Sequence, residues 1–104
     1  MLEFYTQTIN FVDTPNSEGR ISAEIDHKFD TKVRSGGVIL NGFHLSFEDG
    51  KDHHWLQGSA LVDNISTKGQ EVKAKVTLQL QDGEDHRINY SDSSAEVLYI
   101  AECE

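Results

Sequence analysis

The chain has 104 residues, of which 37% are hydrophobic and 26% are charged. This length and composition are those of one folded domain, residues 1–104, and not of a disordered chain. The formal net charge is −9, which argues against nucleic acid and anionic membranes as partners, because binding to either needs a basic face.

Alternation of apolar and polar residues, typical of β-strands, runs along most of the chain. Residues 1–14 are expected to form an extended N-terminal arm or strand that ends in the loop around Pro15. Residues 21–29 then alternate without a break and predict a half-buried strand. Ser35, Gly36 and Gly37 are typical of a turn, and a further strand is expected over residues 38–47.

The second half of the chain continues in the same way. Strands are expected over residues 54–65 and 72–80, and a short run over 88–90. The last strand, residues 95–101, is apolar on both faces, which predicts a central position in a sheet. Six or seven short strands with frequent turns and no helical periodicity predict an all-β fold, an antiparallel β-sandwich.

A short phrase occurs twice, 33 residues apart: Asp-Gly-Lys-Asp-His from Asp49 and Asp-Gly-Glu-Asp-His from Asp82. Asp-Gly between two alternating runs predicts a β-hairpin, because glycine accepts the positive φ of tight hairpin turns. In an antiparallel meander, alternate hairpin loops lie at the same end of the sheet. The two loops are therefore expected to gather their polar side chains there: Asp49, Asp52, His53, His54, Asp82, Glu84, Asp85 and His86.

Three interpretations of this gathering remain open. The residues are simply good turn formers, or they bind a polar ligand such as a sugar, with Trp55 or Tyr90 offering an apolar face. Alternatively, their carboxylates and imidazoles bind a metal ion, although the spacing matches no known ligand motif. No arrangement of residues required for nucleophilic catalysis is visible, so no enzyme and no cofactor are expected.

The single cysteine, Cys103, excludes an intramolecular disulfide. The N-terminus lacks the basic and apolar segments of a signal peptide, and no stretch approaches the ~20 apolar residues of a membrane span. A soluble product made in the cytoplasm is therefore expected, with its final destination left open.

From about Arg20 to Glu102, the order of features resembles the H-type lectin family. The resemblance rests on the strand of residues 21–29, the Val-Ile-Leu run at 38–40, the polar loop at 48–52, and the final Ala-Glu-Val-Leu-Tyr-Ile-Ala-Glu strand. It implies a six-stranded antiparallel sandwich that assembles as a homotrimer and binds galactose or N-acetylgalactosamine. The family's sugar site uses a Trp-His pair before the last two strands. Here His86 matches the histidine and the tryptophan is missing.

Together these observations predict a non-catalytic carbohydrate-binding module in a homo-oligomer. The residues expected to contact the ligand come from the two Asp-Gly loops: Asp49, Asp52, His53, His54, Trp55, Asp85, His86 and Arg87. Similar modules occur in phage tail and receptor-binding proteins. A structural or adhesion module of a larger assembly is therefore the first alternative, and a metal-binding protein the second.

Overall fold

The protein was analysed as a computed structural model, which describes residues 1–49, 51, 55–82, 84 and 86–104, with the backbone alone at 55 and 56. Its strands are β1 (Leu2–Asn10), β2 (Arg20–Lys28), β3 (Val33–His44), β4 (Trp55–Lys68), β5 (Glu71–Asp82) and β6 (Ser94–Cys103). They pair antiparallel into two three-stranded sheets, β1-β6-β3 and β2-β5-β4. The described residues contain no helix that could cross a membrane.

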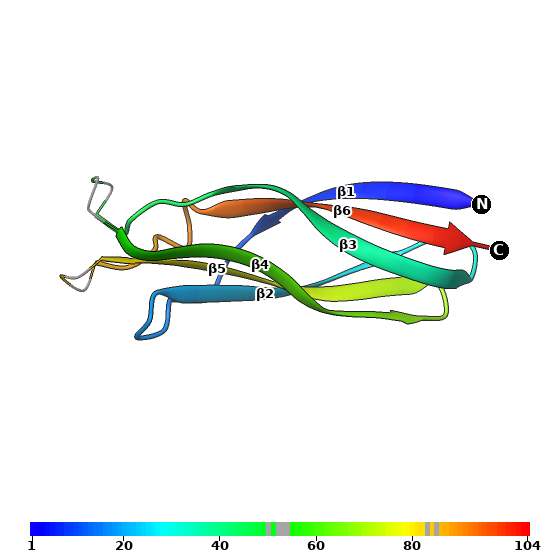
Figure 1. Cartoon of the computed structure of the whole chain (residues 1–104), viewed down its shortest axis with the longest axis horizontal. Helices are drawn as coiled ribbons and strands as arrows, with labels where there is room; N and C mark the ends of the chain where they lie inside the picture. Colours follow the sequence, from blue (N-terminus) through cyan, green and yellow to red (C-terminus); the bar gives the residue numbers. More distant parts are fainter. Residues whose placement is uncertain (50, 52–54, 83, 85) are drawn as a thin grey trace.

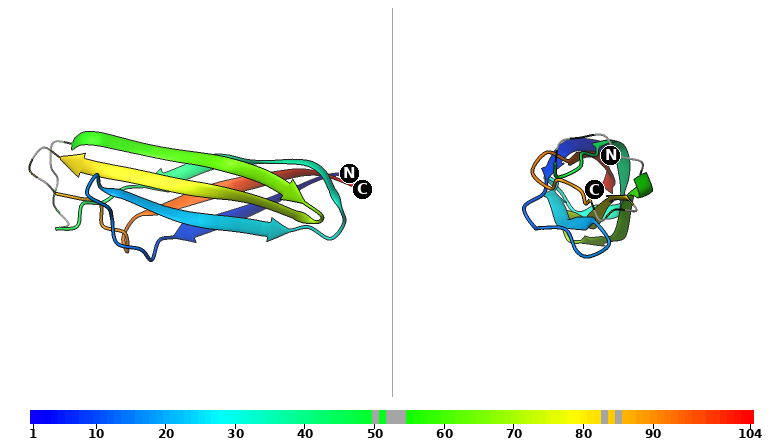
Figure 2. Two further views of the ribbon diagram at one scale, coloured as in Figure 1. Left: turned by 90° about the horizontal axis from the view of Figure 1, so that it is seen from below. Right: turned by 90° about the vertical axis from the view of Figure 1, so that its left-hand side faces the viewer.

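The two sheets lie one above the other in a sandwich-like arrangement (Figure 1), and the molecule is elongated, with extents of 51 × 19 × 19 Å. Seen end-on, the strands surround a single core (Figure 2). The inward residues of β5 and β6 form the centre of this core: Val76, Leu78, Val97 and Tyr99 are each 0% exposed. The alternation in the sequence thus correctly predicted an all-β fold.

Strands β5 and β6 are the central strands of their sheets. For β6 this confirms the predicted central position, since β1 pairs with one of its edges and β3 with the other. The N-terminal arm is strand β1, which pairs with β6 from Leu2 opposite Glu102 to Asn10 opposite Ser94.

The turn expected at residues 35–37 does not exist, because both glycines lie inside β3. Glycine is needed at position 36 because the two sheets pack closely there. A Cβ atom on Gly36 would lie 2.8 Å from Cγ2 of Val72 on β5, closer than side-chain atoms pack. Gly36 therefore marks a close approach between the sheets instead of a chain reversal.

The hairpin prediction holds only locally and only for the second Asp-Gly loop, where Gln81 and Arg87 form an antiparallel bridge. Neither loop joins two neighbouring strands of one sheet, although this had been expected. The first joins β3 to β4 and the second joins β5 to β6, and in both cases the chain passes from one sheet to the other. The one hairpin within a sheet that the described residues form is β4–β5, whose turn contains Gly69 with φ 60°. Asp-Gly favours a local turn, but it does not determine which sheet the next strand joins.

The expectation that the two loops lie at the same end is nevertheless met. The connections β1–β2, β3–β4 and β5–β6 all lie at the end opposite the two termini (Figure 1), here called the loop end. There the chain forms a small antiparallel ladder. Phe47 bridges Ile88, the Glu48 amide donates to the Arg87 carbonyl at 2.8 Å, and the Asn89 amide donates to the Ser46 carbonyl at 2.6 Å.

Candidate functional site

The ladder at the loop end brings together side chains from both Asp-Gly loops. Asp49, Asp82 and His86 form a group that we call the Asp-His cluster. Nδ1 of His86 lies 2.6 Å from Oδ2 of Asp82, and Nε2 of His86 lies 3.8 Å from Oδ2 of Asp49. His86 is thus flanked by a carboxylate on each side of its ring, one from each loop.

Asp82 holds its own turn in place. Its side chain is only 5% exposed, and its Oδ1 accepts the backbone amides of Glu84 at 2.9 Å and His86 at 2.8 Å. In the first loop, Oδ1 of Asp49 accepts the amide of Lys51 at 3.0 Å. Both copies of the repeated phrase therefore begin with an aspartate that bonds the amide two residues later, as in Asx-turns.

The environment changes the acid-base behaviour of the second loop. Burial alone would raise the pKa of Asp82. The hydrogen bonds from the His86 amide and ring and from the Glu84 amide outweigh it and hold this pKa below 3.8. The hydrogen bond to Asp82 raises the pKa of His86 above 6.5 against partial burial, with help from the charges of Asp49 and Glu84. Both shifts favour the same ion pair, an imidazolium between carboxylates.

The sequence-predicted ligand residues are placed as follows. Asp49 and His86 come together in the cluster. Arg87 is half-buried beside it and contributes its carbonyl to the ladder, while Trp55 begins β4 opposite Asp82. The other four predicted ligand residues lie outside the described part of the chain: Asp52, His53, His54 and Asp85.

The sequence-based ligand set omitted Asp82, which is the best-buried member of the cluster. Its place as the first residue of the repeated phrase was the available signal. The pattern shows only that such an aspartate favours a turn. That the same carboxylate also orients a histidine four residues later depends on how the turn folds back.

Asp82, Glu84 and His86 each offer one ligand atom within 4.8 Å of the others, a spacing that a metal ion could use. Both oxygens of Asp82 already accept hydrogen bonds that shape the turn. A metal ion at Asp82 would compete with these hydrogen bonds for the lone pairs of the two oxygens. The donor chemistry therefore suits a metal ion, whereas the hydrogen bonding favours a purely structural role for Asp82.

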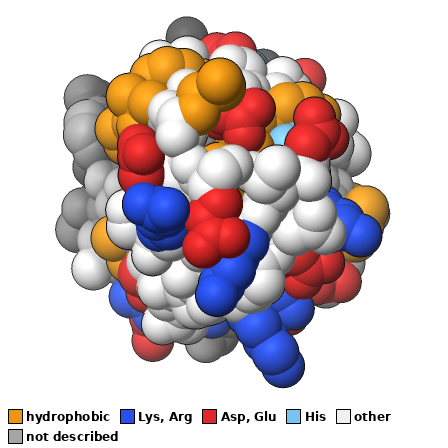
Figure 3. Space-filling view, turned by 90° about the vertical axis from the view of Figure 1, so that its right-hand side faces the viewer, with side chains coloured by type: hydrophobic (Ala, Val, Ile, Leu, Met, Phe, Trp, Pro, Cys, Tyr) orange, Lys and Arg blue, Asp and Glu red, His pale blue; other side chains and the backbone are white. Residues whose placement is uncertain are grey.

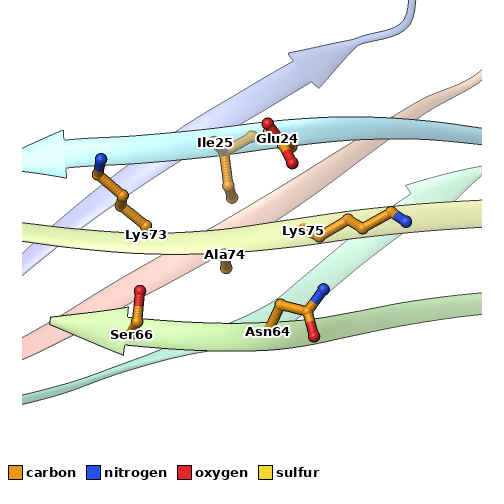
Figure 4. Close-up of a pocket in the computed structure, with 7 residues that line it drawn as sticks. All are labelled: Glu24, Ile25, Asn64, Ser66, Lys73, Ala74 and Lys75. Carbon is orange, nitrogen blue, oxygen red and sulfur yellow. The ribbon is translucent and has the colours of Figure 1, made fainter.

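A second polar region lies on the outer face of the β2-β5-β4 sheet. A shallow hollow of about 220 Å³ is lined there by side chains from all three strands (Figure 4): Glu24, Ile25, Asn64, Ser66, Lys73, Ala74 and Lys75. Lys75 stands in register between Glu24 on β2 and Asp63 on β4. Alternating charges across neighbouring strands stabilise a solvent-facing sheet. This hollow is accordingly part of a cross-strand charge ladder, and it contains no residue of the predicted ligand set.

Comparison with known proteins identifies no relative: the chain matches no protein-family model, no curated protein and no solved structure.

Proposed function

We propose that the protein is a non-catalytic carbohydrate-binding module of lectin type, with its sugar site at the Asp-His cluster. The observation that carries this proposal is the approach of His86 to Asp49, 3.8 Å across two loops that are distant in sequence. Carboxylate oxygens accept hydrogen bonds from sugar hydroxyl groups, and an imidazole can donate or accept. Two loops held by a rigid ladder at one rim of a sandwich are a common location for binding residues.

The resemblance to H-type lectins is compatible with this proposal. It implies six antiparallel strands, and the chain forms six strands in two sheets. It also directs attention to His86, the residue that the resemblance matches to the family's sugar-site histidine. Assembly as a homotrimer is part of the proposal, and a galactose-type sugar is the ligand that the resemblance implies.

A glycan array tests the proposal directly. The wild-type protein is expected to bind a defined set of glycans, and His86→Ala to lose that binding because it removes the central group of the cluster. Asp49→Asn is a second variant that keeps the Asp82–His86 contact and removes one charged acceptor. His44→Ala serves as the matched control, since His44 is exposed at the end of β3 and lies outside the cluster.

A blank array for the folded wild-type protein would overturn the carbohydrate proposal. Binding that persists in both His86→Ala and Asp49→Asn would move the sugar site elsewhere. The metal-binding alternative is favoured by the three ligand atoms within 4.8 Å. It predicts a zinc or calcium ion that is retained through gel filtration and lost in Glu84→Gln.

A further inference from the structure

The outer faces of the two sheets differ in chemistry. On the β2-β5-β4 sheet, the residues facing away from the core are mostly charged or polar, and they pair in register across the strands, as Glu24 pairs with Lys75 and Asp26 with Lys73. Such a face is stable in water. On the β1-β6-β3 sheet, the equivalent positions in the half nearer the termini are largely apolar.

The apolar positions of the β1-β6-β3 sheet follow from its register. Tyr99 and Val97 of β6 are fully buried, so Ile100 and Leu98 point outward. Phe4 of β1 stands opposite Ile100, and Ile39 of β3 stands opposite Leu98. We call this group the apolar face, and it has five members: Leu2, Phe4, Ile39, Leu98 and Ile100. Leu2, Phe4 and Ile39 are 55%, 58% and 52% exposed.

The apolar face also contains a hollow of about 370 Å³. Gly36 and Gly37 contribute no side chain to it, and a Cβ on Gly37 would meet no atom within 4 Å. A β-bulge in β4 between Asp63 and Ser66 carries Ile65 to the rim of this hollow. In Figure 3, hydrophobic side chains gather on the upper side of the molecule, over the β1-β6-β3 layer.

We propose that the apolar face is covered by another copy of this chain, an inference that rests on the homo-oligomer in the proposed function and names its interface. Only two outward positions of the β1 and β6 strands in this sheet are charged, Glu96 and Glu102. A net charge of −9 makes two copies repel each other. Such copies can pack closely only where charge is sparse, and the apolar face is that place.

The apolar face is also self-complementary. It carries both a protruding aromatic side chain, Phe4, and the hollow at Gly37. Phe4 lies on one edge strand of the sheet and the hollow lies at the other, so each copy can insert Phe4 into the hollow of the next copy. Such a head-to-tail contact closes in a ring. An anionic membrane does not suit this acidic chain.

The whole outer face of the β1-β6-β3 sheet, of which the apolar face is the part nearer the termini, offers area for self-association. Three strands spaced about 4.8 Å apart and roughly ten residues long give an outer face of roughly 33 by 14 Å. Three copies that turn this face inward bury on the order of 1,400 Å² together, three times the area of one face.

Two lysine substitutions test the interface. Ile39 on the apolar face and Leu61 on the other sheet are both 52% exposed, so Ile39→Lys and Leu61→Lys change similar side chains at equal exposure. Light scattering after gel filtration is expected to give the wild-type protein a multiple of 11.7 kDa, three times for the proposed trimer. Ile39→Lys should weaken association by roughly a hundredfold, because it buries a charge in the contact, and Leu61→Lys should leave it unchanged.

A second pair of variants keeps the charge constant. Phe4→Ala removes the inserted side chain, and Gly37→Val puts a branched side chain into the hollow, at a position where a Cβ would meet no atom within 4 Å. Both are expected to weaken association while circular dichroism shows an intact fold. A wild-type protein that stays monomeric at all concentrations, or equal loss in Ile39→Lys and Leu61→Lys, would overturn the interface. Neither result bears on the glycan array, which tests the sugar site separately.

Discussion

Asp82 shows how one side chain can serve two structural purposes. Its Oδ1 fixes the turn through two backbone amides, and its Oδ2 orients His86. The carboxylate is 5% exposed, so its ionised form persists because these donors replace water. Any ligand at the loop end would therefore meet an imidazole held in a fixed orientation.

The titration of His86 is the first prediction. Its pKa is expected above 6.5 in the wild-type protein and to fall toward 6.5 in Asp82→Asn, which removes the charged acceptor. Asp49→Asn should lower it less, because the Asp49 carboxylate is farther from the ring, at 3.8 Å. Ring-proton or nitrogen chemical shifts followed by NMR across pH measure this. An unchanged titration in Asp82→Asn would show that the hydrogen bond does not control the pKa.

The same shifts determine how stability depends on pH. The raised pKa of His86 contributes stability that is complete below pH 6.5 and is lost as pH rises through the folded-state value. The lowered pKa of Asp82 contributes stability that is present above pH 3.8 and is lost as pH falls through its folded-state value. The pair therefore stabilises the loop end most between these two limits. Thermal unfolding of the wild type and His86→Gln should differ most in that range.

Only part of the candidate site could be predicted from the sequence. The repeat of Asp49 and Asp82 at the head of the same phrase correctly indicated two turns with equivalent chemistry. The spatial approach of Asp49 to His86 depends on the ladder between residues 46–48 and 87–89. The predicted strands reached into both segments, but alternation within a segment does not show which other segment it pairs with. Sequence patterns report local preference, whereas this contact joins residues 37 positions apart.

Among the strands, β3 shows how packing between elements overrides local preference. Adjacent glycines are usual in turns, yet Gly36 and Gly37 continue a strand. Their environments differ: Gly36 faces Val72 of the opposite sheet, whereas Gly37 faces open space. The two positions form a natural matched pair.

The second prediction uses that pair. Gly36→Ala is expected to destabilise the protein by about 1–3 kcal/mol, because its Cβ would overpack against Val72. Gly37→Ala should be neutral or stabilising by up to about 1 kcal/mol, because alanine loses less backbone freedom in a strand than glycine does. Urea unfolding measures the difference in the free energy of unfolding, provided that this free energy falls with urea concentration at the same slope in both variants. Equal losses would mean that the close approach at Gly36 is not what excludes a side chain.

The sequence predicted the strands themselves better than it predicted their order within the sheets. β5 alternates clearly, β6 is apolar on both faces, and each lies at the centre of its sheet. The crossing from β3 to β4 and from β5 to β6 leaves no trace in the alternation, since a strand looks the same whichever sheet it joins. The apolar outer face of β6 was visible in the sequence as residues apolar on both sides. It indicated a covered strand without indicating what covers it.

At the scale of the whole molecule, charge and apolar surface oppose each other. The net charge of −9 separates copies of the chain, while the apolar face draws them together. Salt shifts this balance: from about 0.01 M to about 1 M ionic strength, the screening length falls from roughly 30 Å to roughly 3 Å.

The third prediction follows from this opposition. Association should tighten as sodium chloride is added, because screening weakens the repulsion and leaves the apolar contact largely intact. Sedimentation equilibrium across a salt series measures the dissociation constant, and chloride is preferable to sulfate, which strengthens apolar burial by itself. Association that weakens with salt would instead indicate an interface held by ion pairs.

The position of β6 between β1 and β3 has a kinetic consequence. The sheet β2-β5-β4 can form from residues 20–82, but β1 and β3 have no partner in their own sheet until the last strand is in place. Pairing of Leu2 with Glu102 closes almost the whole chain into one loop, and such distant contacts form slowly. Folding of this protein should consequently be slow for a chain of its length. Until β6 pairs, the edges of β1 and β3 have no partner in their own sheet, and unpaired edges are where chains associate wrongly.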